Sequence, residues 1–173
     1  LLEVHYLDVG QGDAMYIRTP GNKHYLLDTG TRSARKQIIP YLKYLDVKEL
    51  DGVILSHSHL DHIGALYYIA DVIPVKSLLY SGHIHTNSHN RKTVKRLQEK
   101  KVKLRKFRAG DTFELDEGVK VEVFHPAVDW DGEVEDPNNM SLVIKITFGE
   151  IDFLFTGDAE KHSEREILKH KFA

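Results

Sequence analysis

The sequence gathers three histidines and one aspartate within six residues, at positions 57–62, HSHLDH. Side chains two positions apart in an extended chain point the same way, so His57 and His59 can bind one metal ion. Asp61 and His62 lie past the bend that follows and can face a second ion. Imidazole and carboxylate groups are suitable ligands for zinc, manganese or iron. A polar loop that merely collects histidines is the alternative, and it explains this density of ligand-type residues less well.

Two further aspartates end predicted strands and could support such a site. Asp158 follows an apolar run, and Gly157 before it allows a close backbone approach, so this carboxylate could bridge two ions. Asp158 could instead be the N-cap of the helix predicted after it. Asp28, before Thr29-Gly30, could accept a hydrogen bond from a ligand histidine or from its loop, or could simply be a turn residue.

The composition limits the kind of site and the kind of protein. The 173 residues include 11 histidines and no cysteine, which excludes disulfides and thiolate metal sites. Hydrophobic residues make up 41% and charged residues 29%, as in ordinary soluble globular proteins, and the net charge of -2 favours no particular partner. No apolar run approaches the roughly 18 to 20 residues that cross a membrane. We expect one compact, soluble domain over residues 1–173.

Strands open the chain and then alternate with helices. Period-two patterns and turn residues predict strands over residues 2–8, 14–19, 24–28, 52–55, 76–80, 102–107, 113–115, 119–124, 141–148 and 151–155. Helical periodicity predicts helices over residues 33–45, 63–73, 87–101 and 159–169, and polar, acidic residues predict a loop over 129–139. This order predicts an α/β (α+β) fold with a mixed sheet and helices on at least one face. The histidine motif then lies at the carboxyl end of a buried strand.

Two other clusters have both a functional and a structural interpretation. Residues 91–108 hold ten Lys or Arg and one acid, Glu99. This segment could attract nucleic acid or another anionic substrate, or it could be a solvated helix face followed by an exposed strand. His83, His85 and His89 could line the mouth of the metal site or belong to a polar surface region.

The motifs resemble those of a known family. HSHLDH fits the HxHxDH motif of the metallo-β-lactamase superfamily. More narrowly, five runs resemble the hydrolase domain of ComEC-type competence (DNA-uptake) proteins: LDVGQGDA at 7–14, LDTG at 27–30, HSHLDHIGAL at 57–66, NNMSLV at 138–143 and FTGDA at 155–159. This branch is also similar to secreted phosphorylcholine esterases.

The resemblance implies a metallo-β-lactamase-type αββα sandwich with two divalent ions, zinc or manganese. It assigns His57 and His59 to the first ion, Asp61 and His62 to the second, Asp158 to a bridging position, and Asp28 and Asp13 to supporting positions. Asp61 would also orient the attacking water as a catalytic residue.

This chain departs from the family pattern in two places. Where many members supply a third histidine to the first ion, the sequence has Asn138-Asn139, and the Asn139 oxygen would be a weak ligand. His125 could compensate, or could simply end a strand. The family also continues with a βαβ portion that carries a His-His-Gly run, whereas this chain ends at Ala173. We therefore expect the C-terminal third of the fold to be absent and the second metal site to be incomplete.

The resemblance implies a metal-dependent phosphodiesterase or nuclease that acts on DNA during competence-related uptake, with a phosphodiester substrate such as single-stranded DNA. A phosphorylcholine-type or other small-ester hydrolase, and a non-catalytic binding or assembly module, are the alternatives. Because the chain starts at Leu1 without Met, we expect a soluble domain excised from a bacterial membrane or secreted protein, without membrane contact of its own.

Overall fold

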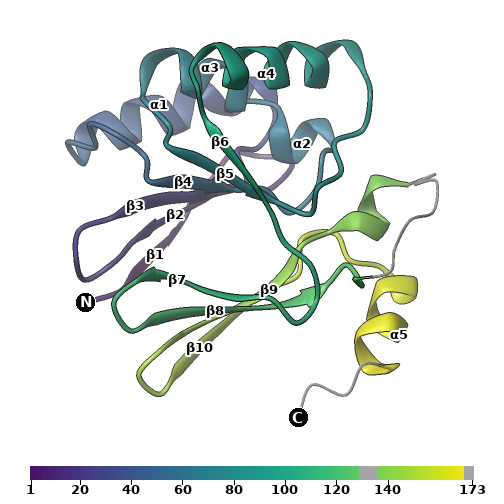
Figure 1. The fold of residues 1–173 in the computed structure, drawn as a ribbon. Helices are drawn as coiled ribbons and strands as arrows, with labels where there is room; N and C mark the ends of the chain where they lie inside the picture. Colours follow the sequence, from purple (N-terminus) through teal and green to yellow (C-terminus); the bar gives the residue numbers. More distant parts are fainter. Residues whose placement is uncertain (129–135, 170–173) are drawn as a thin grey trace.

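Two β-sheets pack face to face in the computed structural model, which describes residues 1–128 and 136–169 (Figure 1). The first sheet has six strands in chain order: β1 (Glu3–Tyr6), β2 (Met15–Arg18), β3 (His24–Leu27), β4 (Gly52–Ile54), β5 (Ser77–Tyr80) and β6 (Lys103–Lys106). Strands β1 to β3 pair antiparallel, and β3 to β6 pair parallel. Because parallel strands end at the same edge of a sheet, the residues that follow β3, β4, β5 and β6 meet there.

The second sheet has four antiparallel strands in the order β10, β9, β8, β7. Their bounds are Thr112–Asp116 (β7), Val119–His125 (β8), Val143–Phe148 (β9) and Ile151–Phe155 (β10). The inner faces of the two sheets share one apolar core, in which Leu27 and Ile54 of the first sheet join Val121 and Ile144 of the second. Burial alternates along β8, as the two-residue period of a strand requires.

Helices cover the outer face of the first sheet (Figure 1). Helices α1 (Arg35–Tyr44), α3 (Leu66–Val72) and α4 (Ser88–Glu99) pack their apolar sides there into a second core cluster. Helix α5 (Lys161–Lys169) contacts β8 and the 3-10 helix η2 (Pro137–Met140). This arrangement confirms the predicted α/β (α+β) sandwich. In the described part of the chain, no helix has the length and apolarity to cross a membrane.

A short helix that the sequence did not predict precedes one of the predicted helices. The helix predicted over residues 63–73 is found as α3, and a separate short helix, α2 (Leu60–Ile63), ends just before it. The backbone N–H and the hydroxyl of Thr29 both donate to the His62 carbonyl, at 2.7 and 2.9 Å. That carbonyl is therefore occupied by a tertiary contact, which overrides the local helix preference.

The other predicted strands and helices are found, with ends shifted by a few residues. The helix predicted over residues 33–45 opens with a short 3-10 helix, η1 (Arg32–Ala34). Of the loop predicted over residues 129–139, residues 129–135 lie outside the described part of the chain. At its described end, the Asp136 carboxylate caps η2 by accepting a hydrogen bond from the Asn138 N–H at 2.9 Å.

Candidate metal centre

His57, His62 and Asp158 form a compact group of ligand-type atoms at the carboxyl edge of the first sheet. One such atom from each residue lies within 4.8 Å of the others. Nε2 of His62 is 3.3 Å from Oδ1 of Asp158, and Nε2 of His57 is 4.0 Å from Oδ2. Both histidines are buried, whereas the Asp158 side chain is 42% exposed. The group is therefore open to solvent on the side of Asp158.

The turn after β10 uses the glycine that precedes Asp158. Gly157 has a φ of +50°, and a Cβ there would lie 2.7 Å from the Cβ of Ser56. The Leu142 N–H donates to the Ser56 carbonyl at 2.7 Å and joins the two sheets at the same point. The close approach that only glycine permits therefore brings a carboxylate of the second sheet to the histidines of the first.

His59 lies at the exposed side of this group. Its Nδ1 is 3.1 Å from Nε2 of His57, so the two rings are neighbours as their spacing predicts. Its Nε2 is 3.7 Å from Oδ1 of Asp136, in the segment that leads into η2. The His59 side chain is 39% exposed, which makes it the most accessible imidazole of the motif.

Asp61 is not a member of either compact group of ligand atoms in the described part of the chain. Its Oδ2 accepts a hydrogen bond from Nε2 of Gln11 at 3.4 Å, in the loop between β1 and β2. Burial raises the pKa of Asp61, but hydrogen bonds from its own backbone and from Gln11 outweigh burial and lower it overall. The carboxylate is therefore ionised at neutral pH, close enough to influence His57 and His62 electrostatically.

Asp28 is fully buried behind His62. Its Oδ2 lies 2.9 Å from Nδ1 of His62 and 2.5 Å from the Ser56 hydroxyl, and its Oδ1 accepts from the Ser56 N–H at 2.8 Å. The hydrogen bond at Nδ1 leaves Nε2 of His62 directed to Asp158. The backbone of Asp28 has a φ of +56°, which aspartate tolerates better than most residues. Asp13 joins Asp28 and His62 in a second group of ligand atoms within 4.8 Å.

Burial and hydrogen bonding give the two buried histidines different charge states at neutral pH. Burial, helped by His62 and His59, lowers the pKa of His57 to about 3, so its ring is neutral. Burial also lowers the pKa of His62, but the hydrogen bond and charge of Asp28 outweigh burial and raise it to about 9. Burial raises the pKa of Asp28 despite its bonds to His62 and Ser56. Without a metal, the Asp28–His62 pair therefore keeps a proton at neutral pH.

These donors fit a divalent metal ion. His57 is neutral and keeps a lone pair, and His62 offers Nε2 with its other nitrogen held by a carboxylate. Asp158 adds a carboxylate whose only ion-pair partners among the described residues are these two imidazoles. Buried imidazole with carboxylate is a donor set for zinc, manganese or iron rather than for calcium or magnesium.

His125 belongs to neither compact group of ligand-type atoms among the described residues. Nδ1 of His125 donates to the Ser141 carbonyl at 2.8 Å, and the residue ends β8. Its Nε2 is buried without a hydrogen-bond partner among the described residues, as is Oδ1 of Asn139. Burial lowers the pKa of His125. The structure thus places His125 at a strand end, separate from His57.

Helix α4 contributes contacts that the sequence did not reveal. Nδ2 of Asn90 donates to the carbonyls of Ser58 and His85, both at 2.9 Å, and the Ser58 hydroxyl accepts from the His85 N–H at 2.8 Å. These bonds fix the backbone between His57 and His59. The only sequence signal for this role of Asn90 was a polar residue in the first turn of a predicted helix. Such residues are too common to identify a contact with the metal centre.

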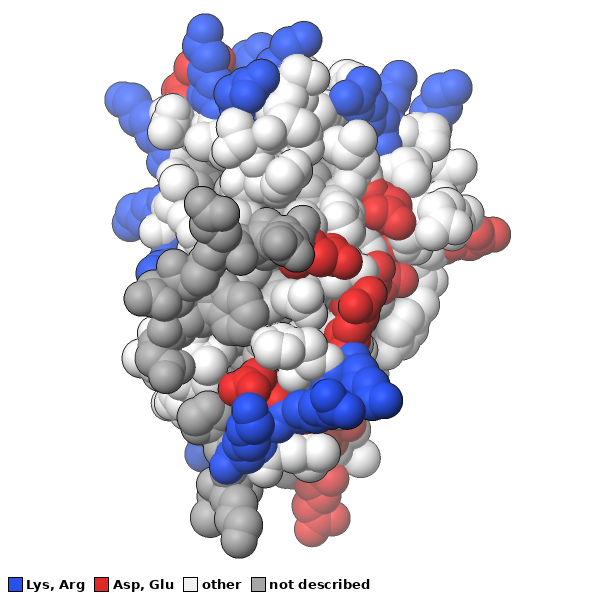
Figure 2. Space-filling view, turned by 90° about the vertical axis from the view of Figure 1, so that its right-hand side faces the viewer, with Lys and Arg blue, Asp and Glu red and all other residues white. Residues whose placement is uncertain are grey.

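The face that carries the carboxyl edge is divided by charge. Acidic side chains gather across its centre and right, whereas Lys and Arg lie at the upper and left margins and in a lower band (Figure 2). Carboxylates at the centre suit cation binding, and the basic margins suit an anionic substrate.

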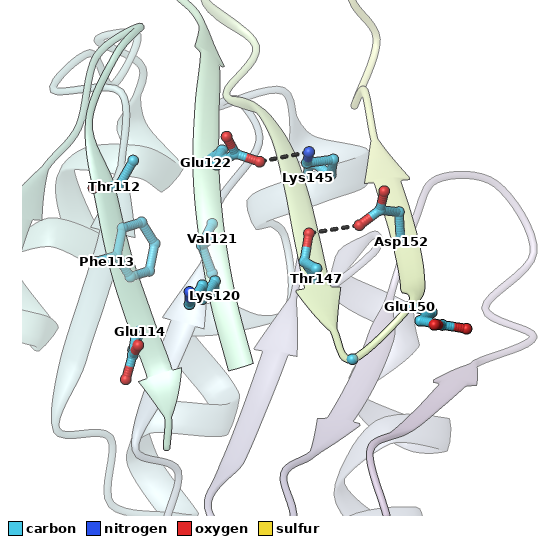
Figure 3. Close-up of a pocket in the computed structure, with 11 residues that line it drawn as sticks. Thr112, Phe113, Glu114, Lys120, Val121, Glu122, Lys145, Thr147, Glu150 and Asp152 are labelled. Carbon is cyan, nitrogen blue, oxygen red and sulfur yellow. Dashed lines mark hydrogen bonds and ion pairs between the residues drawn. The ribbon is translucent and has the colours of Figure 1, made fainter. Parts of the chain in front are cut away.

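A separate groove lies away from the metal centre. It has a volume of about 580 Å³ and lies on the outer face of the second sheet (Figure 3). Its polar side chains pair with one another, Glu122 with Lys145 and Thr147 with Asp152, each at 2.5 Å. None of the histidines of the motif lines it, so it is not the metal centre.

The fold and the clustered ligands define a metallo-β-lactamase-type sandwich. Residues 7–170 match the Metallo-beta-lactamase superfamily, and the chain belongs to this superfamily. The superfamily consists mostly of metal-dependent hydrolases.

Similar proteins of known name include competence proteins. The chain is 28% identical to ComE operon protein 3 of Bacillus subtilis (strain 168) over 186 residues, which cover 96% of this chain and 23% of that protein. It is 28% identical to Competence protein ComA of Neisseria gonorrhoeae over 162 residues, 93% of this chain and 20% of that protein. The chain thus spans about a fifth of these relatives. The structure of the metallo-beta-lactamase SMB-1 is similar with a TM-score of 0.59 and 14% identity, over 96% of this chain and 68% of that one.

Proposed function

We propose that this chain is a metal-dependent phosphodiesterase, a nuclease that acts on DNA in competence-related uptake. The observation that carries the proposal is the group of His57, His62 and Asp158, with Asp28 buried behind it. The competence proteins among its relatives and the basic segment at residues 91–108 support DNA as the substrate.

In this proposal the ligands are His57, His59, His62, Asp61 and Asp158, and the expected ions are two zinc or manganese ions. Divalent ions held there would polarise the phosphoryl group and make water nucleophilic at neutral pH. Asp28 holds His62 in the tautomer that presents Nε2. Asp61, ionised beside the histidines, orients the attacking water and accepts its proton. Asp13 and Asn139 are proposed as a supporting residue and a weak ligand.

Cleavage assays with added metal test this function. The purified chain should cleave single-stranded DNA and bis-p-nitrophenyl phosphate when zinc or manganese is supplied, and His59→Ala should abolish both activities. The matched control is His85→Ala, an exposed histidine outside the group, which should retain activity. Equal activity in wild type and His59→Ala would contradict the proposal.

The same assays separate the alternatives. Faster cleavage of p-nitrophenyl phosphorylcholine than of DNA would indicate a small-ester hydrolase. Stoichiometric metal without hydrolysis of any ester would indicate a binding or assembly module. Asp61 belongs to neither compact group of ligand atoms among the described residues, an observation that favours this last outcome.

A further inference from the structure

Arg108 and His83 follow neighbouring strands at the edge that carries the metal centre. Strands β5 and β6 pair in parallel with Tyr80 opposite Lys106, and the Phe107 N–H donates to the Tyr80 carbonyl at 2.9 Å. The chain then continues to His83 on one strand and Arg108 on the other. Because β4 pairs in turn with β5, the residues that follow β4, β5 and β6 leave the sheet at the same edge, and β4 and β6 lie roughly 10 Å apart, two strand spacings.

The Arg108 side chain is half-buried. It forms no ion pair with any carboxylate in residues 1–128 and 136–169, and it makes one long hydrogen bond, 3.4 Å, to the Phe107 carbonyl. Burial lowers its pKa, and the charge of Asp111 offsets this only in part. Taking a charge out of water without a partner is unfavourable, so this side chain is suited to receive an anion.

The turn that contains Arg108 does not need its side chain. The Arg108 N–H donates to Oδ2 of Asp111 at 2.7 Å, and the Asp111 N–H donates back to the Arg108 carbonyl at 3.0 Å. The Ala109 N–H donates to the Pro126 carbonyl at 2.8 Å. Backbone groups and the Asp111 carboxylate thus hold the turn between the two sheets, which leaves the guanidinium free for another role.

His83 offers a second donor at the same place. Its Nε2 is buried and has no hydrogen-bond partner among the residues that the structure describes. Burial is the main cause of the lowered pKa of His83, with smaller contributions from His85 and from Arg108. The ring is therefore neutral and can present an N–H at Nε2. A buried N–H without a partner costs free energy that a ligand oxygen would recover.

We propose that Arg108 and His83 bind a second phosphate group of the substrate beside the metal centre, an inference that rests on the proposed phosphodiesterase function. A guanidinium donates two parallel hydrogen bonds to phosphate oxygens, and the imidazole N–H supplies a third. The remaining basic residues of β6 are exposed along the same strand and would guide the strand that carries this phosphate.

Phosphate binding to the chelator-treated protein tests the site without requiring catalysis. Inorganic phosphate is titrated while the side-chain NMR signals of Arg108 and His83 are followed. Arg108→Ala and His83→Ala should each weaken binding about tenfold, and Arg108→Lys should fall between Arg108→Ala and wild type because a lysine lacks the bidentate geometry. Thermal unfolding of each variant confirms that it is folded.

Arg105→Ala is the matched control. Arg105 is an exposed arginine on β6 whose guanidinium lies over the rings of Phe107 and Phe113, at 5.2 and 5.8 Å. Its removal should leave phosphate affinity unchanged. Unchanged phosphate affinity in Arg108→Ala would overturn the inference. An equal loss of affinity in Arg105→Ala would also overturn it, because that result would mean that only the general basic field attracts phosphate.

Oligonucleotides identify the source of the phosphate. Tetrathymidylate is compared with and without a 5′-phosphate. If the 5′-phosphate tightens binding, and Arg108→Ala removes this gain, the site binds a terminal phosphate. Equal Arg108-dependent binding of both would assign an internal phosphodiester. In the metal-loaded protein, Arg108→Ala should lower kcat/KM for the oligonucleotide about tenfold and leave bis-p-nitrophenyl phosphate unaffected. If the wild-type enzyme is active and Arg108→Ala changes neither phosphate affinity nor kcat/KM for the oligonucleotide, the phosphate site is refuted and the nuclease function stands.

Discussion

Nδ1 of His62 lies 2.9 Å from Oδ2 of Asp28, and both side chains are almost completely buried. This contact fixes which nitrogen of His62 carries the proton and directs the other to Asp158, 3.3 Å away. The orientation of a ligand histidine is thus set by a residue 34 positions earlier in the chain.

Asp28→Asn should weaken metal binding by about 10- to 100-fold, because the amide cannot hold His62 in the same charge state and orientation. Competition with a chromogenic chelator for zinc measures the affinity. Asp116→Asn is the control, since that carboxylate, at the end of β7, is also hydrogen-bonded but accepts from Thr19 and Gly21 in the hairpin between β2 and β3. Wild-type zinc affinity in Asp28→Asn would contradict a supporting role.

The stability of the chelator-treated protein should fall as the pH rises from about 6.5 to about 9. The pKa of His62 is raised from 6.5 in the unfolded chain to about 9 in the fold by the Asp28 hydrogen bond. Its stabilising contribution is therefore complete below pH 6.5 and is lost as the pH passes about 9.

Urea unfolding at a series of pH values measures this loss. His57 works in the opposite direction over a lower range, since its pKa of about 3 makes the fold less stable as the pH falls below 6.5. Asp28→Asn should remove the decline above pH 6.5. A flat profile for the wild type between pH 6.5 and 9 would show that the pair does not hold the proton.

Asp61→Asn should lower kcat by about 10²- to 10⁴-fold, as expected for loss of a group that moves a proton. Metal content should fall by no more than one equivalent, because Asp61 is a proposed ligand of the second ion and the group of His57, His62 and Asp158 remains. Elemental analysis and phosphodiester cleavage give the two readouts. Asp8→Asn, in the loop between β1 and β2 whose Gln11 contacts Asp61, should retain activity. A kcat in Asp61→Asn equal to that of the wild type would contradict the catalytic role.

Gly12→Ala should destabilise the protein by roughly 3 kcal/mol and disturb the metal centre. A Cβ at this position would lie 1.9 Å from the Asp61 carbonyl oxygen, and the backbone φ is +93°. Gly10→Ala separates strain from collision: its φ is +74° and its Cβ would meet nothing within 4 Å, so it should cost only about 1 kcal/mol. Urea unfolding that gives equal losses for both variants would mean that the contact with Asp61 is unimportant.

The fold could be predicted largely from local patterns. Alternation along β8 and the glycine-containing turns locate the strands, because strand faces and turns depend on the chain within a few residues. The break between α2 and α3 could not be predicted, since it depends on the contact between Thr29 and the His62 carbonyl. Residues that are distant in sequence decide where that helix ends.

The sequence by itself determined the ligand types, their order and the family, because HSHLDH and TGD are local chemical patterns. The tertiary structure decided which of these side chains meet. Helix α2 begins at Leu60, so the alternation of an extended chain no longer orients Asp61 and His62. His62 then turns to Asp158 and Asp28, while Asp61 turns to Gln11. The pairing of β5 with β6, which joins distant parts of the chain, likewise placed Arg108 beside His83.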